Sequence, residues 1–154
     1  MYYIKISKLI IDEEKTFQLF EKVKCTGKEY KGTGLLVVRD SYTKPQYLID
    51  IDKQVNPTYF KDSYFVASKG QKPHTDDGRT ACITFLINDP DNRPTKFENK
   101  HELFYDGCYL INTKVTHSCS FSDQQRVLYQ IELDDHYDFS YYKNRVLDGK
   151  LFNI

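Results

Sequence analysis

Two stretches of the sequence decide the fold: HTDDGRTACITFLIN at residues 74–88 and LINTKVTHSCSFSDQQRVLYQIEL at residues 110–133. In each, a polar segment with one histidine leads into an apolar run, ACITFLI at 81–87 and RVLYQIEL at 126–133. Short runs rich in β-branched and aromatic residues are typical of buried strands. We therefore expect strands whose ends lie beside histidine-bearing loops.

Runs of the same kind recur along the chain and are separated by turn residues. They cover 2–11, 34–38, 46–51, 64–67, 96–98, 102–105 and 108–112. Many short strands at roughly even spacing indicate a β-sandwich or barrel. Asp106-Gly107 connects two of these runs, and a two-residue Asp-Gly connection predicts a β-hairpin.

Segment 12–24 is the best helix candidate. Asp12 can cap its first turn, and Phe17, Phe20 and Val23 recur at helical spacing, which gives the helix one apolar face. A second, short helix is expected in the C-terminal tail.

Composition excludes several classes of protein. The 154 residues include 22 Lys and Arg and 22 Asp and Glu, so the chain lacks the basic excess of a dedicated nucleic-acid binder. Two alanines against 13 tyrosines and 10 phenylalanines disfavour a helix bundle. No apolar run approaches the ~20 residues of a membrane span. Lys5 and Lys8 interrupt the N-terminal run, which is expected to be a strand and not a signal peptide.

The four cysteines, Cys25, Cys82, Cys108 and Cys119, lie far apart and form no CxxC pair. This spacing disfavours a disulfide scaffold and a cysteine zinc site. We expect free thiols in a reducing, cytoplasmic compartment.

A candidate metal site begins at His74. In an extended strand residues i and i+2 point to the same side, so His74 and Asp76 can bind one ion together. A further histidine would complete a set of two histidines and one carboxylate, which is diagnostic of non-haem Fe(II) oxygenases. His117, just after another strand, is the candidate. His101 and His136 are expected in solvated turns.

Arg126 opens an otherwise apolar strand. If Arg126 and Leu128 face the interior, the alternate residues pack on the other side: Val127, Tyr129, Ile131 and Leu133. A buried guanidinium needs an anion, and a dicarboxylate ligand could supply one through a bidentate pair. The alternative is a residue on the rim that pairs with a surface acid.

Together, His74-x-Asp76, His117 and Arg126 resemble the Fe(II)- and 2-oxoglutarate-dependent oxygenases, over about residues 63–135. The resemblance implies a mainly β fold, the double-stranded β-helix or jelly roll, here with one N-terminal helix and a short C-terminal one. Two histidines and the aspartate would bind Fe(II), and Arg126 would bind the distal carboxylate of 2-oxoglutarate. The remaining position would take O₂.

Two branches of the family are most similar. Asp77-Gly78-Arg79 before an apolar strand resembles the prolyl-hydroxylase-like branch, and Arg79 matches a basic residue that faces cosubstrate or substrate. Asn112, five residues before His117, holds an Asp/Asn position of the Asp/Asn β-hydroxylase-like branch.

The family often places a tyrosine near the distal carboxylate, on the strand after the HxD motif. Phe85 stands near that place and cannot donate a hydrogen bond. The hydroxyl could come instead from one of four residues, Tyr64, Ser63, Ser68 or Thr84.

The resemblance further implies an enzyme, a dioxygenase that hydroxylates a substrate C–H while 2-oxoglutarate is converted to succinate and CO₂. The expected substrate is a polypeptide side chain of Pro, Asp or Asn type, without membrane or nucleic-acid partners. We expect one domain at 1–154, with N-terminal strands and helix at 1–62, the metal-site barrel at 63–135 and a tail at 136–154. The alternatives are a non-catalytic metal- or ligand-binding jelly roll and a nucleic-acid-modifying oxygenase.

Overall fold

The computed structural model describes residues 1–153, which form eleven β-strands and three α-helices. The helices are α1 (Glu13–Val23), α2 (Gln46–Lys53) and α3 (Phe139–Leu147). The strands are β1 (Tyr3–Ile6), β2 (Lys28–Glu29), β3 (Leu36–Val38), β4 (Phe60–Ser68), β5 (Gln71–His74), β6 (Ala81–Asn88), β7 (Thr95–Phe97), β8 (Glu102–Leu103), β9 (Cys108–Asn112), β10 (His117–Cys119) and β11 (Arg126–Leu133).

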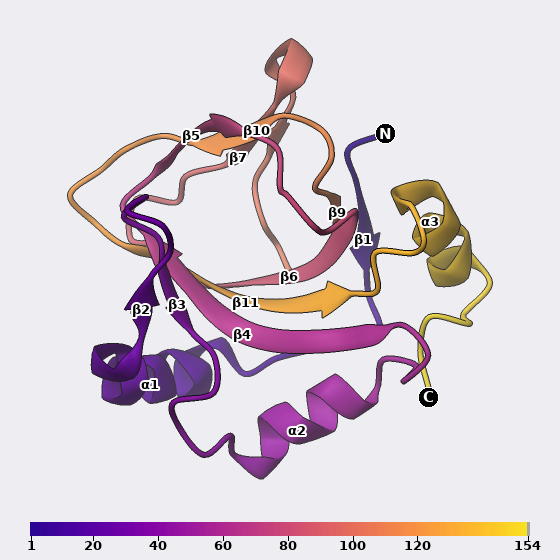
Figure 1. The fold of residues 1–154 in the computed structure, drawn as a ribbon, viewed down its shortest axis with the longest axis horizontal. Helices are drawn as coiled ribbons and strands as arrows, with labels where there is room; N and C mark the ends of the chain where they lie inside the picture. The colour runs from indigo at the N-terminus through magenta and orange to yellow at the C-terminus, as the bar shows by residue number, and fades with distance from the viewer. Residues whose placement is uncertain (154) are drawn as a thin grey trace.

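The strands make two antiparallel sheets. A seven-stranded sheet has the order β1-β9-β6-β11-β4-β3-β2, and a four-stranded sheet has the order β5-β10-β7-β8. Figure 1 shows β5, β7 and β10 above the large sheet, with α1 and α2 beneath its opposite face. This is the mainly β, jelly-roll architecture that the sequence predicts.

Strand β11, at the centre of the large sheet, is buried along nearly its whole length, and its side chains alternate between the two faces of the sheet. One set packs in the core between the sheet and the helices: Val127, Tyr129, Ile131 and Leu133. The alternate residues of the strand line a cavity between the sheets: Arg126, Leu128, Gln130 and Glu132. The sequence left two positions open for Arg126, the interior and the rim, and in the structure Arg126 is buried and lines the cavity with Leu128, as the period of two in a strand requires.

The two predicted helices form. Asp12 caps α1 by accepting a hydrogen bond from the Lys15 N–H at 3.0 Å, and Phe20 is fully buried against the sheet. The C-terminal helix α3 begins after Asp138, whose side chain accepts from the Tyr141 N–H at 2.8 Å. Within residues 1–153, no helix has the length and apolar character needed to cross a bilayer.

The run at 46–51 was expected to be a strand, and this prediction is wrong, because these residues form α2. Leu48 and Ile51, three residues apart, are buried together, which is helical and not strand spacing. A side-chain hydrogen bond from Gln46 Nε2 to Asp50 Oδ1, 2.8 Å long, supports the same helical turn. Similarly, the N-terminal run is a strand only at Tyr3–Ile6.

The hairpin predicted at Asp106-Gly107 is also wrong. Strand β8 pairs with β7 in the small sheet, while β9 pairs with β1 and β6 in the large one. Asp106 and Gly107 therefore carry the chain from one sheet to the other, and Gly107 has a φ of 134°. The Asp106 carboxylate contacts Lys5 Nζ at 3.1 Å and accepts a hydrogen bond from the Tyr109 hydroxyl. These contacts fix the crossover, which local turn chemistry alone cannot distinguish from a hairpin.

Candidate metal centre

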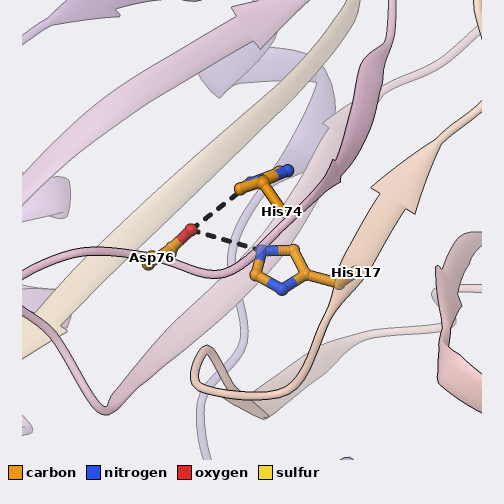
Figure 2. Close-up of side chains that lie close together, drawn as sticks. All are labelled: His74, Asp76 and His117. Carbon is orange, nitrogen blue, oxygen red and sulfur yellow. Dashed lines mark ion pairs between the residues drawn. The ribbon is translucent and has the colours of Figure 1, made fainter.

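His74, Asp76 and His117 converge on one point at the edge of the cavity. His74 ends β5 and His117 begins β10, and the two residues are directly opposite each other in this antiparallel pair. Asp76 Oδ1 lies 3.4 Å from His74 Nε2 and 3.3 Å from His117 Nε2 (Figure 2). One donor atom from each residue lies within 4.8 Å of the others, so the group could hold a metal ion. The structure thus brings together the three residues that the sequence singled out.

The other ring nitrogen of each histidine is held by the backbone. His74 Nδ1 lies 2.7 Å from the Lys72 carbonyl oxygen, and His117 Nδ1 lies 2.8 Å from that of Val115. A carbonyl can only accept, so Nδ1–H donates in both rings and Nε2 is the atom left to ligate. This outer support is the usual means of orienting metal-binding histidines.

Asp76 is fixed by its backbone and its second oxygen. The Asp76 N–H donates to the Thr113 carbonyl at 3.0 Å, and the Asp76 carbonyl accepts from Lys114 Nζ at 3.3 Å. Arg79 places Nε and Nη2 each 2.6 Å from Asp76 Oδ2. Oδ1 is therefore the oxygen that faces the histidines.

The electrostatics favour an ionised carboxylate. Burial alone would raise the pKa of Asp76, but hydrogen bonds from His117 and His74 and the charge of Arg79 hold that pKa well below its usual range. The hydrogen bond to Asp76 in turn raises the pKa of His74. Without a cation, each Nε2 can approach the carboxylate favourably only as an N–H donor. A divalent cation among the three atoms would replace those protons.

The cavity that His74 and His117 line has a volume of about 600 Å³ and is also lined by Arg126. Arg126 is only 6% exposed, and among residues 1–153 no carboxylate lies within 4.0 Å of it. Its Nη1 donates to Thr95 Oγ1 at 3.0 Å, and that oxygen lies 3.0 Å from the Tyr105 hydroxyl. The guanidinium also lies 5.8 Å from the centre of the Tyr105 ring. A buried cation without a carboxylate, beside two hydroxyl groups, is suited to bind an anion.

Thr95 and Tyr105 were not singled out from the sequence. Thr95 begins the short strand β7 and Tyr105 lies just after β8, and nothing in their local sequence pattern distinguishes them from ordinary residues of a β-rich chain. They reach Arg126 because the small sheet folds over the start of β11. The one feature of the sequence that could have pointed to Thr95 and Tyr105 was Arg126, because a buried guanidinium requires polar neighbours.

The four hydroxyl candidates lie in different places. Tyr64 and Thr84 line the cavity. Ser63 faces the helices, where its hydroxyl donates to Asp52 Oδ2 at 2.6 Å, and Ser68 pairs with Arg126 in the ladder without lining the cavity. Phe85 packs in the core on the helix side, so the cavity-facing neighbour on that strand is Thr84.

The remaining candidates are placed as follows. Arg79 lines the cavity with its guanidinium engaged by Asp76. Asn112 does not line the cavity, and its amide contacts the Met1 carbonyl at 3.4 Å. His101 is exposed, its ring packs at a tilt against Tyr2 and Tyr3, and its Nε2 lies 3.0 Å from the Tyr3 hydroxyl.

A second group of metal-binding residue types, Asp134, Asp135 and His136, lies at the end of β11. It is a turn on the surface, where Asp134 Oδ1 accepts from the His136 N–H at 2.9 Å and the His136 side chain is 81% exposed. Exposed groups of this kind are common in turns, and among residues 1–153 no further metal-binding side chain joins this one.

No protein-family model matches the chain, and no curated protein sequence matches it. Solved structures do. A Trichoplax adhaerens prolyl hydroxylase in complex with a hypoxia inducible factor peptide fragment matches with a TM-score of 0.60 and 10% identity, over 94% of this chain and 86% of that one. The viral collagen prolyl hydroxylase of Paramecium Bursaria Chlorella virus-1, in a 2OG complex, matches with a TM-score of 0.54 and 13% identity, over 86% and 95%.

The non-haem alpha ketoglutarate dependent epimerase SnoN from nogalamycin biosynthesis also matches, with a TM-score of 0.57 and 10% identity, over 86% and 78% of the two chains. At these identities the matches show the fold. The chain has the double-stranded β-helix, or jelly-roll, fold of these three enzymes, of which SnoN is named as alpha ketoglutarate dependent and the viral hydroxylase was solved with 2OG.

Proposed function

We propose that this protein is an Fe(II)- and 2-oxoglutarate-dependent oxygenase that hydroxylates a substrate C–H bond. One observation carries the proposal: two histidines and an aspartate converge beside a cavity that is also lined by a buried arginine, which has no carboxylate partner among residues 1–153. That one cavity is lined by both features supports the proposal. The named 2-oxoglutarate enzymes with the same fold support this reading.

The donor set fits the metal. Two imidazole nitrogens and one carboxylate oxygen, with the second oxygen held by Arg79, form the facial triad that leaves three positions of an octahedral ion open. His74, Asp76 and His117 would hold Fe(II) here. The bound ion would supply the activation of O₂ that is coupled to decarboxylation of 2-oxoglutarate.

The arginine end of the cavity fits the cosubstrate. Arg126 would pair with the distal carboxylate of 2-oxoglutarate, and the Thr95 and Tyr105 hydroxyls would donate to the same group. Tyr105 would then take the part that a tyrosine on the strand after the HxD motif plays in many relatives. Leu128 and the buried wall of the cavity would exclude water from this pair, which strengthens it.

A polypeptide side chain is the proposed substrate, of Pro, Asp or Asn type. Support comes from the Trichoplax adhaerens enzyme, which was solved with a peptide fragment. The mouth of the cavity carries the exposed rings of Tyr30 and Phe121, which could pack against a chain. The SnoN match shows that this fold also serves an epimerase.

Succinate formation tests the activity. Purified protein with Fe(II), ascorbate, O₂ and 2-oxoglutarate should release succinate slowly without substrate and faster with a suitable peptide. Asp76→Ala should abolish both rates. A wild-type rate equal to that of Asp76→Ala, with metal bound, would leave the non-catalytic binding module as the better reading.

A further inference from the structure

The two oxygens of Asp76 have separate partners. Oδ1 faces both histidine Nε2 atoms, at 3.4 and 3.3 Å. Oδ2 receives two hydrogen-bond donors from Arg79, Nε and Nη2, each at 2.6 Å. The carboxylate is thus divided between a metal-facing oxygen and an arginine-facing oxygen.

Arg79 is itself fixed. Its Nη1 donates to the Tyr64 hydroxyl at 3.0 Å and to Gln130 Oε1 at 3.1 Å, and its carbonyl accepts from Thr113 Oγ1 at 3.0 Å. Tyr64 and Gln130 are direct partners in the β4–β11 ladder, so both anchors belong to the rigid large sheet. The guanidinium therefore has three side-chain partners, Asp76, Tyr64 and Gln130.

The contact between Arg79 and Asp76 affects how many coordination positions of a bound metal ion the protein fills. A carboxylate can bind an ion through one oxygen or through both. If Asp76 used both, one of the three positions needed by 2-oxoglutarate and O₂ would be lost. Two short charge-assisted hydrogen bonds to Oδ2 compete directly with that second metal bond. A lysine, with one compact ammonium, cannot reproduce the planar fork.

We propose that Arg79 is a positioning residue that confines Asp76 to one-oxygen coordination and so keeps open the metal positions that the cosubstrate requires. The inference rests on the proposed function, and it assigns Arg79 to the metal ligand and not to the cosubstrate. Strand β11 then contributes two residues to the site: Arg126, which would bind the cosubstrate, and Gln130, which accepts a hydrogen bond from Arg79.

Co(II) substitution tests this without turnover. Visible absorption of protein-bound Co(II), which reports ligand number and geometry, is recorded without 2-oxoglutarate for wild type, Arg79→Lys and Arg79→Gln. We expect both variants to bind one Co(II) with an altered spectrum and with an affinity lower by about 10- to 100-fold, the usual effect of losing a group that orients a ligand. Arg145→Gln is the matched control, since Arg145 also pairs with an aspartate three residues away, at 2.8 Å, but on α3. Its spectrum should equal that of wild type.

An unchanged Co(II) spectrum in correctly folded Arg79 variants would overturn the proposal. If the spectrum were unchanged but 2-oxoglutarate bound more weakly, Arg79 would contact the cosubstrate directly, which also overturns it. A wild-type chain that binds Co(II) but not 2-oxoglutarate would contradict the proposed function alone, since the spectral comparison needs only the metal. A wild-type chain that takes up no Co(II) would overturn both. If both Arg79 variants fail to fold, Tyr64→Phe, which removes one anchor of Nη1, carries the same spectral test.

Discussion

His74 and His117 lie directly opposite each other on antiparallel strands β5 and β10, and the centres of their rings are 4.4 Å apart. The pairing of these two short strands is what joins the two halves of the candidate metal site. Both rings donate Nδ1–H to a carbonyl two residues earlier in the chain, so the strands fix the orientation of the rings as well as their separation.

The ligand set leads to the first prediction. His74→Ala, Asp76→Ala and His117→Ala should each lower Mn(II) or Fe(II) affinity by at least about 100-fold, because each removes a bond to the ion. Isothermal titration calorimetry measures this directly. His101→Ala and His136→Ala are the matched controls and should bind one ion as wild type does. Lost stoichiometry in either control, or full binding in both His74→Ala and His117→Ala, would show that the site lies elsewhere.

The second prediction concerns Arg126. A hydrogen-bonded charge pair contributes ~1.5–3 kcal/mol, so Arg126→Ala should weaken 2-oxoglutarate binding to the Mn(II) form by about 10- to 150-fold. Metal affinity should stay near that of wild type, and Arg126→Lys should recover part of the loss through charge alone. Equal 2-oxoglutarate affinity in wild type and Arg126→Ala would rule out this role.

Tyr105 allows a narrower test of the same end of the cavity. Tyr105→Phe removes one hydroxyl and keeps the ring beside Arg126. We expect 2-oxoglutarate affinity to fall about tenfold, in line with one lost hydrogen bond to a charged group. Tyr109→Phe is a suitable control, because that hydroxyl donates to Asp106 outside the cavity. Comparable losses in the two variants would mean that the effect is not specific to the arginine end.

Metal binding should also depend on pH. The hydrogen bond to Asp76 raises the pKa of His74 in the metal-free protein, and a protonated imidazole cannot ligate. Metal affinity should therefore be highest above that raised pKa and fall as the pH drops below it, by about tenfold per pH unit for each competing proton. Mn(II) titrations at several pH values measure the slope. An affinity that is flat across the pKa of His74 would argue against His74 as a ligand.

A buried network on the helix side of the sheet has a structural role that can be separated from the site. Asp52 on α2 contacts Lys44 Nζ at 2.9 Å and accepts hydrogen bonds from Tyr129 at 2.9 Å and Ser63 at 2.6 Å. Asp52→Ala leaves these groups without their partner, so we expect the free energy of unfolding to fall by about 1–3 kcal/mol.

Urea denaturation measures this loss, with the exposed Asp50→Ala on the same helix as control, expected within about 0.5 kcal/mol of wild type. Metal binding by folded Asp52→Ala should be unchanged, since the network faces away from the cavity. A stability equal to that of Asp50→Ala would show that the network contributes little.

Features of this structure that depend on neighbouring residues could be predicted from the sequence, and features that depend on which strands pair could not. The alternation of side chains along β11 was predictable, because one face of the strand is continuously apolar, but the sequence left open whether Arg126 lies inside or on the rim. The proximity of His74 and Asp76 followed from the same period of two. Their meeting with His117 depended on the resemblance to a family, since strand pairing is not a local property.

The two wrong predictions, the strand at 46–51 and the hairpin at Asp106-Gly107, both relied on short stretches of sequence. Residues 46–51 have the apolar content of a strand, and only the burial of Leu48 and Ile51 on one helical face decides otherwise. Asp106-Gly107 has ideal hairpin chemistry, yet its flanking strands belong to different sheets. Thr95 on β7 and Tyr105 just before that crossover meet Arg126 of the other sheet, a contact between sheets that no short stretch of sequence encodes.

The central claim is that one cavity holds a metal ion and 2-oxoglutarate together, and anaerobic titration tests it most directly. Fe(II) is added to the protein without O₂, followed by 2-oxoglutarate, while the visible spectrum is recorded. We predict a weak metal-to-ligand charge-transfer band that saturates at one equivalent of each and is absent in His117→Ala. Bound Fe(II) without such a band in the wild-type protein would contradict the account.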